Sequence, residues 1–426
     1  MQPAIYPLSH PWPWWRKGLF CFSAIYLLLF MAPWTWLGEA PGLATVAKLY
    51  GEAENWLVTA GNARLFHVKD VLVPMGGSGD TSYGYAQLCF FALTAAVGAV
   101  AWRALDRRRP NYAVAYYWLL VLVRHFVALI SLSYGILKLF AQQMTFPSLS
   151  ALATPLGDLL PMRFAWFFIG YSHPYQVFTG VLETLAGLLL LHRRTATLGA
   201  VMGAGVFLNV MMMNLCYDIP VKLFSIHLFV LCLFLLLGDA ERLLNFFVFN
   251  RPTPPAWALP LPGRRARIAW LTLKTIFIGV FVLMPFYQLY ARQQENRQLV
   301  KGRLTTGVFE VERFEGTLPD SLRWKDVVFE TTTSGSILTA DTLLRQRYRR
   351  SYFAYTLDSA RQTIAFKKMA SDSLPAFTLH YAQPDTNHLV LRGQLRHDSV
   401  YVTLRRQPRH FQLAERQFHW LSEANR

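Results

Sequence analysis

Apolar stretches long enough to cross a lipid bilayer dominate the first two thirds of the chain. An α-helix needs about 20 apolar residues to cross a hydrocarbon layer about 30 Å thick. Seven stretches meet this length and predict membrane helices near 17–37, 84–102, 113–141, 174–191, 196–214, 220–238 and 266–288. We therefore expect an α-helical membrane bundle of about seven transmembrane helices over residues 1–291.

From about residue 292 the pattern changes from the period of a helix to that of a strand. Apolar and polar residues alternate in six short segments separated by Gly, Pro, Asp and Asn turns, namely 307–313, 327–331, 352–357, 377–381, 388–392 and 400–405. This alternation predicts a small antiparallel β-rich domain over residues 292–426, either a sandwich or a barrel. We expect Trp324 and Trp420 to belong to its core.

The overall composition agrees with a membrane protein and excludes several other classes. Of the 426 residues, 53% are apolar and 16% are charged, and the formal net charge is +17. These values exclude a soluble single-domain enzyme and a disordered chain. They also exclude a disulfide scaffold. The four cysteines are widely spaced and form no CxxC pair, so they are better explained as buried structural thiols.

The positive charge follows the loops between the apolar stretches, which argues for membrane topology and against nucleic-acid binding. Four Lys or Arg residues lie on one side of the predicted bundle, in the long loop 38–82 and in the segment 143–173. Thirteen lie on the other side: Arg16, Lys17, Arg103, Arg107, Arg108, Arg109, Arg193, Arg194, Arg242, Arg251, Arg264, Arg265 and Arg267. The positive-inside rule then places the N-terminus in the cytoplasm and the C-terminal domain outside.

Polar residues inside the third predicted span fall on one face of the helix. Arg124, Ser131, Gly135, Lys138 and Gln142 are separated by seven, four, three and four residues, which brings them together at about 100° per residue. A charge near the bilayer centre costs at least about 2.5–3.5 kcal/mol. This face should therefore point into protein.

The fourth span contains a single acidic residue, Glu183, flanked on the same face by Gly180 and Gly187. The two glycines would let another helix or a ligand approach closely. Two interpretations of Glu183 have equal weight: a structural ion pair with Arg124, or a role in handling protons at mid-membrane.

The sixth span opens with the densest group of polar residues in the chain: Asn214, Asp218, Lys222, Ser225 and His227. Asp218 is suited to cap the first turn of the helix. Asp218, Lys222 and Ser225 share one face. His227 points to the other side and is better explained as a packed, hydrogen-bonded histidine.

Topology brings the outer ends of the third and sixth spans to the same depth. We therefore predict one polar pocket in the outer half of the bundle that contains Lys138, Gln142, Asp218 and Lys222, with the segment 143–173 as its cover. Arg163, Tyr171 and His173 are candidates for its rim. No metal-ligand spacing is evident.

Residues 113–238 resemble the DoxX-type family of bacterial membrane proteins. The resemblance lies in Tyr134-Gly-Ile-Leu-Lys138, in the stretch from Gln142 to Pro147, and in Glu183-Thr-Leu-Ala-Gly187. It implies a bacterial cytoplasmic (inner) membrane location, so that the C-terminal domain, placed outside by the charge asymmetry, would be periplasmic. Because some members are associated with quinol oxidation, it also implies a role linked to quinones or quinols.

The stretch 134–138 and the residues Asp218, Lys222 and His227 are also similar to the transmembrane domain shared with vitamin K-dependent γ-carboxylases. In those enzymes a lysine deprotonates vitamin K hydroquinone, and the resemblance would give that role to Lys138. The chain lacks the large lumenal region of the carboxylases, which disfavours peptide carboxylation.

Three functional hypotheses follow. In the first, a DoxX-like protein binds a quinone-like or other amphipathic molecule, with Lys138, Asp218 and Lys222 as chemical groups. Its candidate ligand-binding residues are Arg124, Tyr134, Gln142, Glu183, Asn214, Ser225 and His227. In the second, a non-catalytic anchor, assembly or envelope-sensing protein displays the β-domain to a membrane or periplasmic partner. The third is a carboxylase-like enzyme with a lysine base. The sequence alone does not decide whether the protein is an enzyme.

Overall fold

The computed structural model describes residues 11–36, 38, 44–74, 79–253, 263–299, 306–331, 333–340, 350–368, 377–395, 398–416 and 418–420. The chain forms two compact units. One unit is helical and comprises Met1–Gln143 and Pro174–Leu289, and the other comprises Met144–His173 and Tyr290–Arg426.

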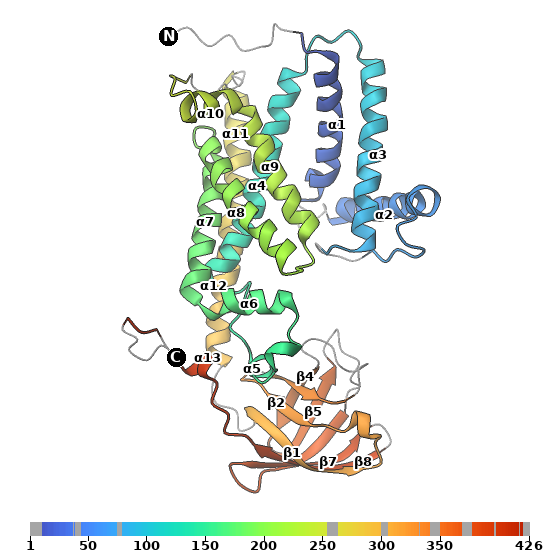
Figure 1. Cartoon of the computed structure of the whole chain (residues 1–426), viewed down its shortest axis with the longest axis vertical. Helices are drawn as coiled ribbons and strands as arrows, with labels where there is room; N and C mark the ends of the chain where they lie inside the picture. Colours follow the sequence, from blue (N-terminus) through green and yellow to red (C-terminus); the bar gives the residue numbers. More distant parts are fainter. Residues whose placement is uncertain are drawn as a thin grey trace. The chain divides into compact units, whose positions relative to one another are not determined.

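Helices build the first unit, and the last of them continues into the second unit from Tyr290 (Figure 1). They are α1 (Trp14–Met31), α2 (Ala44–Gly61), α3 (Ser82–Leu105), α4 (Ala113–Leu139), α7 (His173–Leu191), α8 (Ala196–Cys216), α9 (Lys222–Gly238), α10 (Ala240–Phe247), α11 (Gly263–Ile278) and α12 (Met284–Leu299). Short 3₁₀ or π segments cover Pro33–Thr35, Asn62–Phe66 and Gly279–Leu283, the last joining α11 to α12.

The expectation of a multi-pass membrane bundle is confirmed. Within the described residues, six helices are long and apolar enough to cross a membrane, or seven if α9 and α10, which are bent by 78°, form one span. These helices coincide with the seven apolar stretches of the sequence. The long loop expected over 38–82 instead contains a helix, α2.

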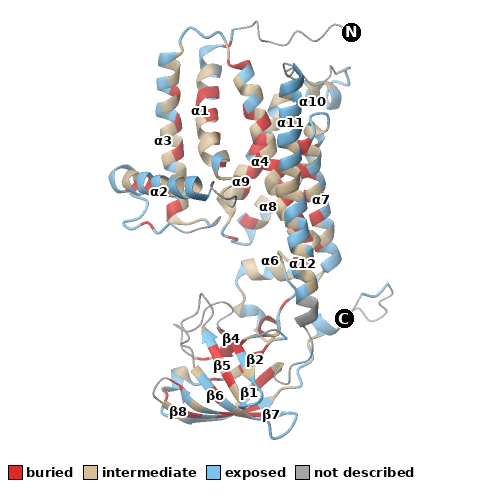
Figure 2. Ribbon diagram, turned by 180° about the vertical axis from the view of Figure 1, so that it is seen from behind, coloured by how far each residue is buried: buried red, intermediate tan, exposed pale blue. Residues whose placement is uncertain are grey.

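The core of the helical unit lies where α1, α4 and α9 meet. Cys21 of α1, Val123 and Leu132 of α4, and Leu231 and Cys232 of α9 are all buried in one apolar cluster. By contrast, α11 has no buried residue along its described length and exposes its apolar side chains (Figure 2). In a bilayer these exposed side chains meet lipid.

The second unit is built around a closed antiparallel barrel of eight strands in sequence order, β1 to β8. The strands are β1 (Gly307–Gly316), β2 (Asp326–Phe329), β3 (Ser334–Leu338), β4 (Ser351–Asp358), β5 (Thr363–Lys368), β6 (Phe377–Ala382), β7 (His388–Leu395) and β8 (Asp398–Arg406). Pairing of β1 with β8 closes the barrel, from Phe309 opposite Arg406 to Gly316 opposite Val400. The expected β-rich domain is therefore confirmed as a barrel. All six predicted strands are present, and β3 and β5 were not predicted.

Aromatic side chains fill the barrel interior. Phe329, Phe353, Tyr355 and Phe366 are buried and lie in ring-to-ring contact. Trp324 is also buried, as expected. The expectation for Trp420 is wrong: it lies after the last strand and is 91% exposed.

The segment 144–173 belongs to the barrel unit, whereas the sequence-based division left it with the helices. It forms α5 (Leu149–Leu152), a 3₁₀ turn at Leu156–Asp158, and α6 (Pro161–Tyr171). The barrel unit also contains a 3₁₀ turn at Asp320–Leu322 and the short α13 (Gln412–Glu415). Hydrogen bonds between α5 and the barrel, described below, are the physical reason for this division.

Candidate functional site

A buried ion pair joins α4 to α7. Lys138 of α4 donates a hydrogen bond to Oε1 of Glu183 of α7, and the two side chains are only 8% and 3% exposed. The structural ion pair proposed for Glu183 therefore exists, but the proposed partner, Arg124, is wrong. Arg124 and Lys138 are 14 residues apart on α4, which separates them by about 21 Å along the helix. Glu183 can reach only one of them.

Glycines bring the two helices close enough for this pair to form. A Cβ atom at Gly180 would lie 2.8 Å from Lys138 Cβ and 2.9 Å from Gly135 O. A Cβ atom at Gly187 would lie 2.8 Å from Leu132 Cγ. The close approach expected at Gly180 and Gly187 is therefore confirmed, and the element that approaches is α4.

Three polar atoms near this contact lack a hydrogen-bond partner within the described part of the chain. They are Oε2 of Glu183, Oγ1 of Thr184 and Oγ of Ser131, and all three are buried. Thr184 also packs against Gly135, because a Cβ at that glycine would lie 2.7 Å from Thr184 N. The α4–α7 contact thus combines one satisfied ion pair with unused hydrogen-bonding capacity.

A second polar cluster lies at the start of α9. Both carboxylate oxygens of Asp80 accept backbone N–H groups, from Lys222 at 2.8 Å and from Leu223 at 3.0 Å. Lys222 Nζ donates to Asp218 Oδ1 at 2.7 Å and lies 3.9 Å from Asp80 Oδ2. The helix is therefore capped by Asp80, and the expectation that Asp218 caps it is wrong. Asp218 has a left-handed backbone (φ 49°), and its side chain is 82% exposed.

The remaining candidates on the sixth span have local roles. Asn214 Nδ2 donates to Val221 O at 3.4 Å, and Ser225 Oγ donates to Lys222 O at 2.9 Å. His227 shares a hydrogen bond of 2.7 Å with the hydroxyl of Tyr26. Its ring stacks on Phe30 at 4.2 Å between centroids. His227 is thus a packed, hydrogen-bonded histidine, as predicted.

Two other candidates on or after α4 have polar side chains in different surroundings. Gln142 Nε2 donates to Leu289 O at 3.2 Å. The Nε of Arg124 is buried and lacks a hydrogen-bond partner among the described residues. Tyr134 lies on α4 directly before Gly135.

The ionisable residues predicted to share one pocket are paired in two groups. Among the described residues, no hydrogen bond or ion pair links Lys138 to Asp218 or Lys222. Lys138 is paired with Glu183, whereas Lys222 is paired with Asp80 and Asp218. Sequence reasoning missed Asp80, which is 142 residues from Lys222 and belongs to a turn-rich connection. In the described chain, no group of three or more His, Cys, Asp or Glu residues could hold a metal ion.

The residues expected to cover and rim that pocket belong to the barrel unit. Arg163 and Tyr171 are part of α6 in the barrel unit, and His173 is at the end of the same segment. Tyr171 donates its hydroxyl to Arg416 O at 3.3 Å, within the barrel unit.

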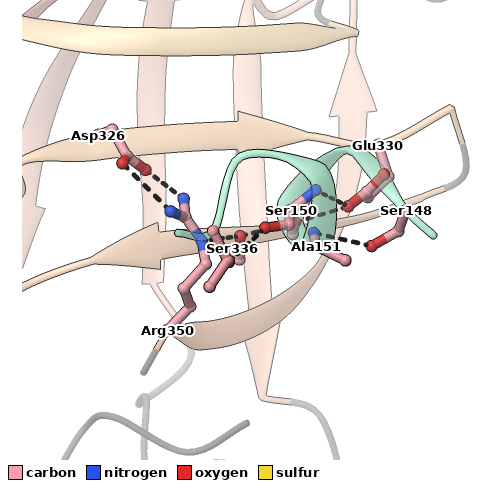
Figure 3. A network of polar contacts seen from close by, with 8 residues as sticks. Ser148, Ser150, Ala151, Asp326, Glu330, Ser336 and Arg350 are labelled. Atoms are coloured by element: carbon pink, nitrogen blue, oxygen red, sulfur yellow. Dashed lines mark hydrogen bonds and ion pairs between the residues drawn. The ribbon is translucent and has the colours of Figure 1, made fainter. Parts of the chain in front are cut away.

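The barrel unit contains a third polar cluster, which binds α5 (Figure 3). The carboxylate of Glu330 accepts the N–H of Leu149 at 3.0 Å, the N–H of Ser150 at 2.9 Å and the Ser150 hydroxyl at 2.6 Å. Ser150 also bonds to Ser336 on β3 at 2.7 Å. A carboxylate that accepts the first N–H groups of a helix stabilises it both as a cap and through the helix dipole.

This cluster continues into the barrel wall through a buried arginine. Arg350 Nε donates to Ser336 Oγ at 2.7 Å, and its two terminal nitrogens bind both oxygens of Asp326. Arg350, Ser336 and Ser150 are all buried. A buried charge held by a bidentate partner and a hydroxyl is satisfied. The cluster therefore fixes α5 to β2 and β3 and offers no open chemistry.

Comparisons with known proteins give a limited result. No family model and no solved structure matches the chain. Over 83 residues the chain is 46% identical to the uncharacterized protein YwoB of Bacillus subtilis (strain 168), and the match covers 20% of this chain. It covers 54% of YwoB, so the chain spans about half the length of this curated relative. The name of the relative carries no activity.

Proposed function

We propose that this protein is a non-catalytic membrane protein whose helical bundle anchors a β-barrel displayed on the periplasmic side of a bacterial cytoplasmic membrane. One observation carries the proposal: the ionisable residues expected to perform chemistry are paired with one another. Lys138 binds Glu183, and Lys222 binds Asp218. A buried ion pair of this kind can hold neighbouring helices in register, and removing one partner is strongly destabilising.

The barrel supports the same proposal. Its closure through β1 and β8 leaves no sheet edge for uncontrolled strand pairing. Its interior is packed with aromatic rings, as in a module that displays an outer surface or braces an assembly. The partner would then be a membrane or periplasmic protein that recognises the outside of the barrel.

Removing one or both members of the buried pair tests the structural role. Lys138→Met leaves the Glu183 carboxylate buried without its partner, which costs about 3–5 kcal/mol. The double variant Lys138→Met/Glu183→Leu removes both charges, so most of the stability should return. Stability is measured by thermal unfolding in detergent, and quinone content is measured by mass spectrometry of the lipids that co-purify.

The two measurements separate the hypotheses. For an anchor, the double variant unfolds near the wild-type temperature and neither protein retains a quinone. A wild-type protein that retains a quinone, lost in the double variant at preserved stability, would reject the non-catalytic proposal.

A second candidate is the binding of a quinone-like or other amphipathic molecule at the α4–α7 contact, in line with the resemblance to DoxX-type proteins. The observation that favours it is the unused hydrogen-bonding capacity of Glu183, Thr184 and Ser131. Lys138 would then act as a base or charge partner toward a quinone oxygen. Ser131→Ala should lower the amount of retained quinone without lowering stability if this candidate is correct.

The orientation of the chain has its own test. A periplasm-dependent reporter enzyme fused after residue 426 should be active, because thirteen of the seventeen loop cations counted above lie on the other side of the bundle. An active cytoplasmic reporter at the same position would reverse the proposed topology.

A further inference from the structure

Helix α2 is set apart from the helices that qualify as membrane spans. It covers Ala44–Gly61 and lies crosswise to α1 and α3, near the end of α3 that begins at Ser82 (Figures 1 and 2). A helix oriented across the spans at one of their ends is in the position of the membrane–water boundary.

One face of α2 packs on the protein. Val58 is fully buried, in a cluster that includes Tyr83 and Ala86 of α3. Glu54 accepts a hydrogen bond from Gln87 at 2.5 Å, and Asn55 accepts one from Tyr83. These contacts fix the rotation of α2 about its own axis and thereby decide where its other residues point.

A second face of α2 is apolar and exposed. It contains Val46, Leu49, Trp56 and Leu57, and Leu49 and Trp56 are 60% and 70% exposed. At about 100° per residue these four positions fall within one third of the helix circumference. Because another face of α2 already packs on the protein, this exposed stripe indicates that α2 contacts a second apolar environment, outside the chain.

A third face is polar. Lys48 and Glu52 lie one turn apart, 3.9 Å from each other, and are strongly exposed. At about 100° per residue they lie about 40° to 100° around the helix from Leu49 and Trp56, along one flank of the apolar stripe. Helix α2 thus has one face against protein, one apolar exposed face and one polar exposed face. The headgroup layer of a bilayer suits such a helix, because it offers acyl chains on one side and water on the other.

The neighbouring helix indicates that the apolar environment of this stripe is lipid. The neighbouring helix α3, a membrane span, exposes Leu93, Val97 and Val100 along its length, and these side chains meet acyl chains in a bilayer. The apolar surface therefore continues from a span to a helix packed against its first turns. Trp56 adds a side chain with an apolar ring and an N–H group, a combination enriched at membrane interfaces.

We propose that α2 is an interfacial helix that lies in the headgroup layer of the bilayer, with Leu49 and Trp56 directed at acyl chains and Lys48 and Glu52 directed at water. The partner of this surface is the lipid itself. The helix then fixes the depth and tilt of the α1–α3 pair, because its apolar stripe resists being moved into water.

Site-directed spin labelling in lipid vesicles tests the proposal on the full-length chain. The exposed Cys89 and Cys216 are first replaced by serine, since Cys21 and Cys232 are buried. Single cysteines are then placed by Leu49→Cys and Leu57→Cys on the apolar face, by Lys48→Cys and Glu52→Cys on the polar face, and by Val97→Cys as the lipid-facing reference. Each label is probed with oxygen, which partitions into lipid, and with a water-soluble nickel complex.

We expect the ratio of oxygen to nickel accessibility at 49 and 57 to be severalfold higher than at 48 and 52 and to approach the ratio at 97. Equal nickel accessibility on both faces would overturn the proposal, because it would place α2 in water. Labels at 49 and 57 that are shielded from both reagents would also overturn it, because a second copy or a protein partner would then cover the stripe. Unchanged elution of each labelled variant in size-exclusion chromatography controls for misfolding.

Discussion

The close contact between α4 and α7 at Gly180 allows us to predict how much stability an added methyl group would cost. Gly180→Ala would place a methyl group 2.9 Å from two backbone atoms of α4, Gly135 O and Leu139 N. Backbone atoms cannot rotate aside, so the helices must separate. Overpacking of this kind costs about 1–3 kcal/mol. Alanine gains back about 0.5–1 kcal/mol over glycine in a helix, which leaves a net loss of up to about 2.5 kcal/mol, with a mid-range value of about 1 kcal/mol.

Gly205→Ala is the matched control. Gly205 lies within α8, and a Cβ at this position would meet nothing within 4 Å. The same substitution should therefore be neutral or stabilising by up to about 1 kcal/mol. Both variants are compared with the wild type by equilibrium unfolding in mixed detergent micelles, followed by circular dichroism. If Gly180→Ala proves as stable as Gly205→Ala, the close contact described here does not hold the two helices together.

Two further predictions concern the barrel unit. Trp324→Ala should destabilise the unit by about 3–5 kcal/mol because it empties a buried site, whereas Trp420→Ala should change stability by less than about 0.5 kcal/mol; thermal unfolding of the full-length variants measures both, and equal losses would contradict the assigned core. The hydrogen bond from the His388 side chain, followed by the N–H of Asn387, lowers the pKa of Asp385 from its ordinary value of 3.8. Its stabilising contribution is therefore present above that ordinary value and is lost as the pH falls through the lower, folded-state pKa. Asp385→Asn should lower the unfolding temperature at pH 7, and the difference should vanish in strong acid; a difference that persists there would contradict an electrostatic origin.

The helical spans could be predicted because bilayer thickness imposes one length on all of them. Strand β3 was not predicted, and the reason lies in its packing. Strand β3 carries Ser334, Gly335 and Ser336, which have low strand propensity. Gly335 is required because a Cβ there would lie 2.5 Å from the ring of Phe353 on the neighbouring strand. The sequence pattern does not contain that cross-strand contact.

The sequence was sufficient to predict which residues belong to the candidate site, but not which of them pair with one another. Glu183 and Lys138 stand out because each is a charge within an apolar run, and both are buried. Their pairing depends on how α4 and α7 are aligned along their length. The pattern of residues within one helix does not determine its alignment with another. The capping of α9 depends on Asp80, which precedes α3, lying next to Lys222, which is 142 residues later in the chain. Such contacts arise from tertiary structure alone.

The attachment of α5 to the barrel can form only late in synthesis. The backbone of Ser150 binds Glu330, 180 residues later in the chain, and β1 cannot find its last neighbour until β8 has been made. A nascent chain that has inserted α4 and α7 therefore carries a connector whose acceptor does not yet exist. Any truncation before residue 398 leaves both edges of the sheet open. An unfinished copy therefore exposes unpaired strand edges, which are templates for pairing with other chains.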